Sequence, residues 1–200
     1  MKTKRYLHSF ALVIAAICVA VVGLAPTTAS AQAVTPMAFA ARPTILAPQG
    51  AFTTCGIRII GAAAIPQSQS EGEVVDVTVA VDVERFVSVK AVYKIGPVSS
   101  GLEKLRPSGK RIEWIRVESA KPLTPIGGQL LPGGAGGYDL FLADLKDGLD
   151  SIDGLLLSKN IWIKFSDGDK SQRIFSGPMQ MTEDVRQQLL SCLSVIAKGG

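Results

Sequence analysis

Histidine is nearly absent from this chain, since His8 is the only one among 200 residues. It lies in an N-terminal segment that we expect to be removed, which leaves the rest of the chain without an imidazole. This excludes Ser-His-Asp and Cys-His catalysis, histidine general bases and every zinc site that requires histidine. A catalytic function would therefore have to rest on carboxylates.

Sequence motifs of several enzyme classes are also missing. There is no G-x-S-x-G nucleophile elbow and no S-x-x-K motif. Two glycine runs, Gly127-Gly128 and the segment 133–137, lack the Lys-Ser/Thr or the following helix that phosphate-binding loops require. We expect a mobile loop there, and the alternative is a lid over a binding site. The contact candidates of this loop are Gly133, Gly134, Gly136 and Gly137.

The first 31 residues have the three parts of a secretory signal peptide: basic residues near the start, an apolar run over residues 10–24, and Ala29-Ser30-Ala31 before the cleavage point. A membrane anchor is the alternative, but the apolar run is short for a span. Cleavage leaves 200 − 31 = 169 residues and removes three basic ones, so the net charge falls from +4 to +1. Because the sequence has no cluster of Lys and Arg, we expect no nucleic-acid partner. We expect a periplasmic or secreted protein without a stable membrane span.

Two cysteines follow the signal peptide, Cys55 and Cys192. Two cysteines in an exported protein usually pair, and neither has a neighbouring group that would activate a thiolate. We therefore predict a structural disulfide between them, against the alternative of a reactive thiol.

Residues 32–54 are rich in Ala and Pro and almost uncharged, so we interpret them as an extended, partly disordered leader. A tether or a partner-binding arm is the alternative. Residues 55–200 then form a single β-rich globular domain, which is long enough to bury a core.

Alternating apolar residues predict much of the domain as strands. The clearest is 73–83, where five valines occupy every second position from Val75 to Val83 and face one side. A hairpin turn at Glu84-Arg85 would lead into the strand 87–95, although one long bulged strand is the alternative. Further strands are predicted at 55–60, 111–119, 138–142, 161–165 and 171–176, the last of them ended by Gly177-Pro178.

Two helices are predicted late in the chain. The first covers 144–157, and the second begins after a Thr182 cap and places Cys192 on its apolar face. The expected fold class is therefore α+β and β-rich: a mostly antiparallel sheet or sandwich with two late helices, one of them tethered by the disulfide.

The strand-turn-strand-helix order of residues 160–196, with its late cysteine, resembles that of small secreted proteins of the invasion-associated locus B type. The likeness covers this part of the chain alone, and the paired upstream cysteines of those proteins are absent. It therefore implies no activity and no site residue.

Aspartates offer the main candidates for a metal site. One group recurs every three residues and consists of Asp144, Asp147, Asp150 and Asp153. On a helix this spacing gives either a Ca²⁺-binding stripe or a solvated face opposite the leucines. Asp167 and Asp169 flank a glycine at a hairpin tip, where turns favour both residue types. We interpret both groups as structural and predict neither a metal nor a cofactor.

Trp162 lies on the face of its strand opposite Ile161 and Ile163. Either it is covered by a helix or it is an exposed aromatic anchor for a partner. We favour a covered position and keep Trp162 as a contact candidate. In the strand 111–119 the apolar pattern changes side at Trp114-Ile115, which indicates a bulge or a strand covered on both faces.

The sequence alone identifies neither a reaction nor a ligand. The absences favour an exported bacterial protein that is non-enzymatic and binds a protein or a small ligand outside the cytoplasm. The alternatives are a carboxylate-based hydrolase acting on an extracytoplasmic polymer and a structural component of the cell envelope.

Overall fold

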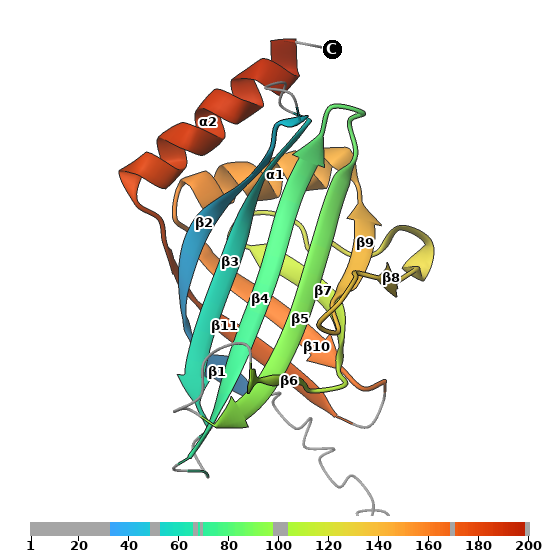
Figure 1. Cartoon of the computed structure of the whole chain (residues 1–200), viewed down its shortest axis with the longest axis vertical. Helices are drawn as coiled ribbons and strands as arrows, with labels where there is room; N and C mark the ends of the chain where they lie inside the picture. The colour runs from blue at the N-terminus through green and yellow to red at the C-terminus, as the bar shows by residue number, and fades with distance from the viewer. Residues whose placement is uncertain are drawn as a thin grey trace, which may run out of the picture. The chain divides into compact units, whose positions relative to one another are not determined.

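The computed structural model describes residues 33–48, 53–65, 68, 70–97, 104–168 and 171–198. The predicted signal peptide lies outside these residues. In the described part, the chain forms one 11-stranded sheet and two α-helices (Figure 1). The sheet curls, so that one face lines the core and the other faces outward.

The strands of the sheet are short at its edges and long at its centre. They are β1 (Val34–Pro36), β2 (Ala38–Leu46), β3 (Thr54–Ala64), β4 (Glu71–Asp82), β5 (Val87–Pro97), β6 (Arg106–Pro107), β7 (Arg111–Val117), β8 (Leu131–Pro132), β9 (Asp139–Ala143), β10 (Asn160–Ser166) and β11 (Gln172–Gln180). The helices are α1 (Leu145–Leu156), α2 (Glu183–Lys198) and the 3-10 helix η3 (Ile126–Gly128). The strand order is β7-β10-β11-β2-β3-β4-β5-β9-β8, with β1 also on β11 and β6 on β5. Described neighbours are antiparallel, except that β1 and β2 lie parallel to β11.

The alternating valines of β4 face the core, as predicted. Those from Val75 to Val81 are buried, whereas Val83 lies past the end of the strand and is 44% exposed. A hairpin turn follows, with Arg85 in the left-handed region at φ 64°, and β5 pairs antiparallel with β4. This confirms the predicted hairpin and excludes the single bulged strand. The other predicted strands and both helices are present, with shifted ends.

The segment predicted as a loose leader contributes two strands to the sheet. β1 and β2 pair with β11, and β2 also pairs with β3. β2 has partners on both sides at Phe39 and Ala40. Pro43 lies past the described pairing with β11, so its missing N–H is tolerated there. These strands join two groups of antiparallel strands into one mixed sheet, which corrects the prediction of an antiparallel sandwich.

β11 runs through Gly177-Pro178, where the sequence analysis ended it. A Cβ atom on Gly177 would lie 1.9 Å from the Met37 carbonyl oxygen, so glycine allows the N-terminal segment to approach. Met37 N also donates a hydrogen bond to the Ser176 carbonyl at 2.9 Å. The glycine therefore marks a close contact between two paired segments and does not end the strand.

Asp139 bridges two strands that lie far apart in the strand order. From β9 its carboxylate accepts hydrogen bonds from Arg111 Nε and, at 3.1 Å, from Ile112 N of β7. Asp139 is buried at this position. A side chain thus spans a gap that backbone pairing leaves open, and the curled sheet forms a mixed half-barrel.

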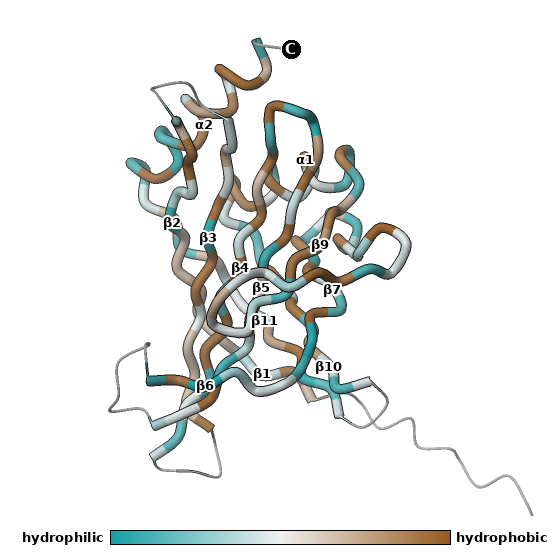
Figure 2. Tube along the Cα trace, turned by 45° about the vertical axis from the view of Figure 1, so that its right-hand side comes forward, coloured by the Kyte–Doolittle hydropathy of each residue, from teal (hydrophilic) through white to brown (hydrophobic). Residues whose placement is uncertain are grey.

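The core fills the concave side of the sheet and extends under both helices. Its largest fully buried side chains include Phe39, Phe141, Phe165 and Phe175. α1 adds Ile152 and Leu155, and α2 adds Leu189. Both helices lie toward the same end of the long strands in Figures 1 and 2. Figure 2 also shows hydrophobic and hydrophilic residues interleaved along the strands, as expected when one face lies in the core.

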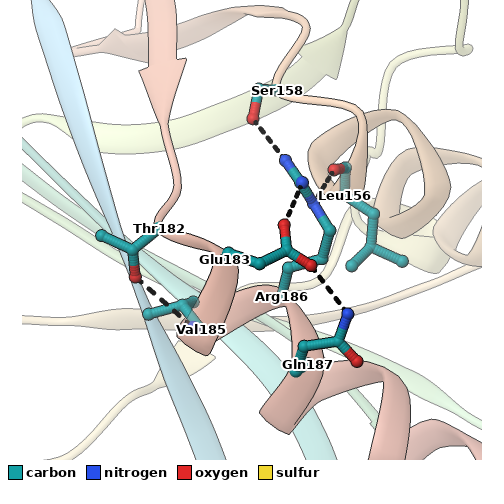
Figure 3. A network of polar contacts seen from close by, with 7 residues as sticks. All are labelled: Leu156, Ser158, Thr182, Glu183, Val185, Arg186 and Gln187. Atoms are coloured by element: carbon teal, nitrogen blue, oxygen red, sulfur yellow. Dashed lines mark hydrogen bonds and ion pairs between the residues drawn. The ribbon is translucent and has the colours of Figure 1, made fainter.

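A polar network links the start of α2 to the end of α1 (Figure 3). Thr182 caps α2 as predicted, because its Oγ1 accepts a hydrogen bond from Val185 N at 3.4 Å. Arg186 donates from Nε to the Leu156 carbonyl at 3.0 Å and pairs with Glu183 at 2.7 Å. A carbonyl at the end of α1 is thereby satisfied by a side chain of α2, which holds the two helices together.

Cys55 of β3 and Cys192 of α2 form the predicted disulfide, with Cα atoms 5.8 Å apart. Both cysteines are completely buried. The bond joins positions 137 residues apart and fastens α2, whose other fully buried residue is Leu189, to the sheet.

Replacing both cysteines by alanine should lower the free energy of unfolding by about 4–5 kcal/mol, because the cross-link restricts a long loop in the unfolded chain. Chemical denaturation of the oxidised native protein and of the Cys55→Ala, Cys192→Ala double variant measures the difference. Native protein unfolded in the presence of a reductant should behave like the variant. An unchanged denaturation midpoint would show that the disulfide contributes no net stability.

Candidate functional site

A charged residue lies buried on the outer face of the sheet. The odd-numbered valines of β4 point inward, so Asp76 lies on the outward face of that strand. It is nevertheless only 6% exposed. In Figure 1, β3, β4 and β5 lie in front of β7, β10 and β11, so their outer face is turned toward the viewer. A carboxylate buried in this way requires partners.

Three hydrogen bonds satisfy Asp76. Arg58 of β3 donates from Nε to Oδ1 at 2.9 Å and from Nη2 to Oδ2 at 2.6 Å. Tyr138, just before β9, donates its hydroxyl to Oδ2 at 2.5 Å. The two-point contact of Arg58 is the geometry that guanidinium and carboxylate groups favour. Both carboxylate oxygens are therefore occupied, and the pair with Asp76 uses two of the five N–H groups of Arg58.

These contacts hold the aspartate charged and the tyrosine neutral. Burial alone raises the pKa of Asp76, but the hydrogen bonds from Arg58 and Tyr138 outweigh it, so this pKa lies below its ordinary value. The hydrogen bond to Asp76 raises the pKa of Arg58. Burial, followed by the hydrogen bond to Asp76, raises the pKa of Tyr138 to about 12. The group therefore holds charge in place near neutral pH and is poorly suited to proton transfer.

The glycine-rich segment positions Tyr138. Gly134, Gly136 and Gly137 have φ values of 89°, 89° and 75°, a region that favours glycine. A Cβ atom on Gly133 would lie 2.8 Å from Tyr138 Cβ, and Gly133 N donates to the Tyr138 carbonyl at 2.7 Å. These glycines thus shape the approach to Tyr138, and their direct contact with a ligand stays a prediction.

Two lysines of β5 lie beside the Tyr138 ring. The ring centroid is 4.7 Å from Lys90 Nζ and 5.5 Å from Lys94 Nζ, and both distances suit cation–π contacts. Asp139 pairs with Ala91 in the ladder of β5 and β9, so Tyr138 reaches β5 between the two lysines. The ammonium groups of both lysines therefore lie beside the same aromatic ring on the outer face of the sheet.

A pocket of about 200 Å³ lies on this outer face. Its lining residues are Arg58, Ile60, Val74, Asp76, Lys94, Leu105 and Tyr138. The lining combines the polar groups of Arg58, Asp76, Lys94 and Tyr138 with three aliphatic side chains, and in the sheet Ile60 pairs with Asp76 and Val74 with Lys94. Lys90 is not part of the lining. A few directed polar groups beside an apolar wall are typical of a small-molecule site.

A second charged cluster lies inside the half-barrel. Glu73 is 3% exposed, and its Oε1 accepts hydrogen bonds from Tyr93 at 3.2 Å and from Arg173. Burial and the Glu73 charge raise the pKa of Tyr93 to about 12. The rings of Tyr93, Phe165 and Phe175 pack together with centroids 5.1 to 6.3 Å apart. Because these rings fill the space beside Glu73, we interpret the cluster as part of the core.

The two tryptophans lie on β7 and β10, outside the pocket lining. Both are half-buried, and the Arg116 guanidinium lies 4.6 Å from the centroid of the Trp162 ring. The pairing of β7 with β10 shifts register between Lys164 and Phe165, beside Trp114, which fits the first of the two predicted alternatives, a bulge. Trp162 is thus partly covered by an arginine of the neighbouring strand, and its role as a partner contact stays a prediction.

Most aspartates at the start of α1 and along it make local contacts with the helix backbone or with nearby lysines. Asp144 accepts a hydrogen bond from Asp147 N at 3.1 Å and caps the helix. Asp147 and Asp150 pair with lysines at 3.7 Å and 2.8 Å. Asp153 is exposed. These contacts fit a solvated helix face.

Metal ligands do not gather in the described residues, which contain no suitable group of three or more His, Cys, Asp or Glu side chains. Asp167 lies in an exposed turn after β10, and its backbone N–H bonds to the Ser171 carbonyl at 3.0 Å. Asp169 lies outside the described residues. Asp167 therefore forms part of the turn after β10 in the structure.

Sequence reasoning missed the residues that form the pocket. Period-two alternation places Asp76 on the outward face of β4, where an exposed aspartate is ordinary. Its partners Arg58 and Tyr138 are 18 and 62 residues away along the chain. A charged residue within a run of valines is the one signal in the sequence, and it does not identify the partners.

Arg58→Met should destabilise the protein, because Asp76 would remain buried with the Tyr138 hydroxyl as its main partner. Since the folded-state pKa of Asp76 is lowered, its pairing adds stability above the unfolded pKa of about 3.9 and loses it as pH falls through the folded pKa. We expect a loss of about 1–3 kcal/mol at pH 7, toward the lower end because the Arg58 side chain is 45% exposed, and a smaller loss at pH 3.

Denaturant unfolding at both pH values measures this loss. Arg42→Met is the matched control, because Arg42 lies opposite Arg58 on β2, is exposed and has no carboxylate partner in the described part of the chain. Equal losses for the two variants, or the same loss at both pH values for Arg58→Met, would contradict the assigned pairing.

Comparisons with protein-family models, with curated proteins and with solved structures found no match for this chain. Within the described ranges, no helix combines the length and the apolar composition needed to span a membrane. The function must therefore be argued from the pocket itself.

Proposed function

We propose that this is an exported, non-enzymatic binding protein whose ligand occupies the pocket lined by Arg58, Asp76, Lys94 and Tyr138. The observation that carries the proposal is the buried Asp76 group in the wall of that pocket. A buried ion pair is weak evidence for stability, since apolar side chains of similar volume often stabilise as well or better. A charged group kept in this position favours a role in recognition.

Regular structure supports the pocket. Arg58, Asp76 and Lys94 lie on the adjacent strands β3, β4 and β5, whose pairing is continuous along this region. The glycine-rich segment holds Tyr138 over the same face. Side chains on paired strands need little reordering when a ligand binds, which lowers the cost of association.

A carboxylate-based hydrolase receives less support. Glycosidases of this kind need two carboxyl groups about 5–10 Å apart across a cleft. The described lining of the pocket contains one carboxylate, Asp76, and both of its oxygens already accept hydrogen bonds. Binding therefore fits this arrangement better than hydrolysis.

Export is proposed on two grounds. Residues 1–31 match the three-part pattern of a signal peptide. The Cys55–Cys192 disulfide is of the kind that persists in oxidising compartments, such as the periplasm or the cell exterior. Together they support a function outside the cytoplasm.

Expression in a bacterial host with intact secretion should yield a protein that begins at Gln32, because the signal peptide is cleaved after Ala31. Intact-mass and N-terminal peptide analysis of the periplasmic and culture fractions measures this. Ala29→Lys and Ala31→Lys would block cleavage and serve as the control. Full-length protein that stays in the cytoplasm would contradict export.

Pocket occupancy can be tested with three probes of similar size and different charge: benzoate, benzamide and benzylamine. We expect at least one of them to shift the backbone amide NMR signals of β3, β4 and β5 in the full mature protein. Leu105→Trp should abolish these shifts, because the larger ring of a lining residue fills much of a pocket of about 200 Å³.

Leu157→Trp is the control for this substitution. Leu157 is 61% exposed after α1, so a tryptophan there changes the surface without entering the pocket. If none of the three probes shifts these signals, or if the shifts persist unchanged in Leu105→Trp, the proposed function is wrong.

A further inference from the structure

We infer that the ligand is a small organic monocarboxylate with an apolar body, and that its carboxylate binds Lys94 and Arg58. This inference rests on the proposed function, since it names the class of ligand for the same pocket. Four features of the lining residues lead to it.

The lining of the pocket offers a ligand more hydrogen-bond donors than acceptors. The acceptor oxygens of Asp76 are occupied by two bonds from Arg58 and one from Tyr138. Donors outnumber acceptors, because Arg58 carries five N–H groups, of which two bond Asp76, and the Lys94 ammonium carries three more. A ligand that supplies acceptors matches these donors, whereas a cationic ligand would meet a carboxylate that is already satisfied.

The charge of the lining indicates a monoanion. Arg58 and Lys94 contribute two positive charges, Asp76 contributes one negative charge, and Tyr138 is neutral because its pKa is about 12. The difference, 2 − 1, is one uncompensated positive charge. A carboxylate carries one negative charge at pH 7, while a phosphate monoester carries about 1.5 to 2. The carboxylate is therefore the better match.

Size and polarity define the rest of the ligand. Ile60, Val74 and Leu105 supply the aliphatic part of the lining of a pocket of about 200 Å³. A protein cavity of about 150 Å³ accepts one benzene molecule. The pocket therefore accommodates an apolar body of about this size together with one carboxylate.

Lys94 and Lys90 provide a matched pair for testing the inference. Both ammonium groups lie beside the Tyr138 ring, at 5.5 Å and 4.7 Å from its centroid, and both lie on β5. Lys94 lines the pocket and Lys90 does not. Removing either charge changes the net charge of the protein equally, so a difference between the two variants reports on the pocket.

Calorimetric or NMR titration of the full mature protein with benzoate, benzamide and benzylamine tests the ligand class. We expect benzoate to bind at least about tenfold more tightly than benzamide, which has the same shape without the charge, a difference of about 1.4 kcal/mol. Benzylamine should bind most weakly. Added salt should weaken the binding of benzoate and leave the affinity of benzamide nearly unchanged.

Lys94→Met should reduce benzoate affinity about tenfold, to the level of benzamide, while Lys90→Met should change it by less than about threefold. Thermal melting of both variants checks that the fold is retained. Equal affinity for benzoate and benzamide, or equal effects of the two lysine variants, would overturn the monocarboxylate assignment while leaving the pocket as a binding site. Failure of all three probes to bind would instead reject the proposed function.

Discussion

The outer face of this sheet depends on how one buried carboxylate is satisfied. Asp76 lies among valines at the centre of the sheet and is 6% exposed, so water cannot stabilise its charge. Arg58 and Tyr138 take that role with three hydrogen bonds. The position of Tyr138 in turn requires the glycines that precede it, and its ring lies between Lys90 and Lys94. The pocket follows from this chain of requirements.

The inner face of the half-barrel therefore forms the core, and the outer face forms the pocket. The inner face packs valine, isoleucine and phenylalanine against α1 and α2, and the disulfide fastens α2 to β3. Because this core supplies the stability of the fold, the outer face of β3, β4 and β5 tolerates a buried ion pair and the two lysines beside Tyr138. A site on such a rigid sheet can hold donors ready for a ligand without a moving lid.

Local patterns in the sequence were sufficient for the longer strands of 54–180 and for both helices, but insufficient for β1, β2, β6 and β8 and for the assembly of the sheet. Alternation of apolar residues along the chain predicted β4 and β5, and apolar residues at helical spacing predicted α1 and α2. The expected export of the protein predicted the disulfide of Cys55 with Cys192. The insertion of β1 and β2 beside β11 was missed, because the prolines of that segment suit an edge as well as a loop. Arg58, Asp76 and Tyr138 were missed because their contacts are long-range, and each is ordinary within its own segment.

The central claim is that Arg58 and Tyr138 hold Asp76 charged within the sheet, and the pKa of its carboxyl group reports on this most directly. Carbon-detected NMR of the side-chain carboxyl, followed from pH 7 to pH 2 in the native protein, measures that pKa. A value below the ordinary 3.8 is the expected result, because the hydrogen bonds from Arg58 and Tyr138 outweigh burial. A value at or above 3.8 would show that burial dominates and would contradict the account.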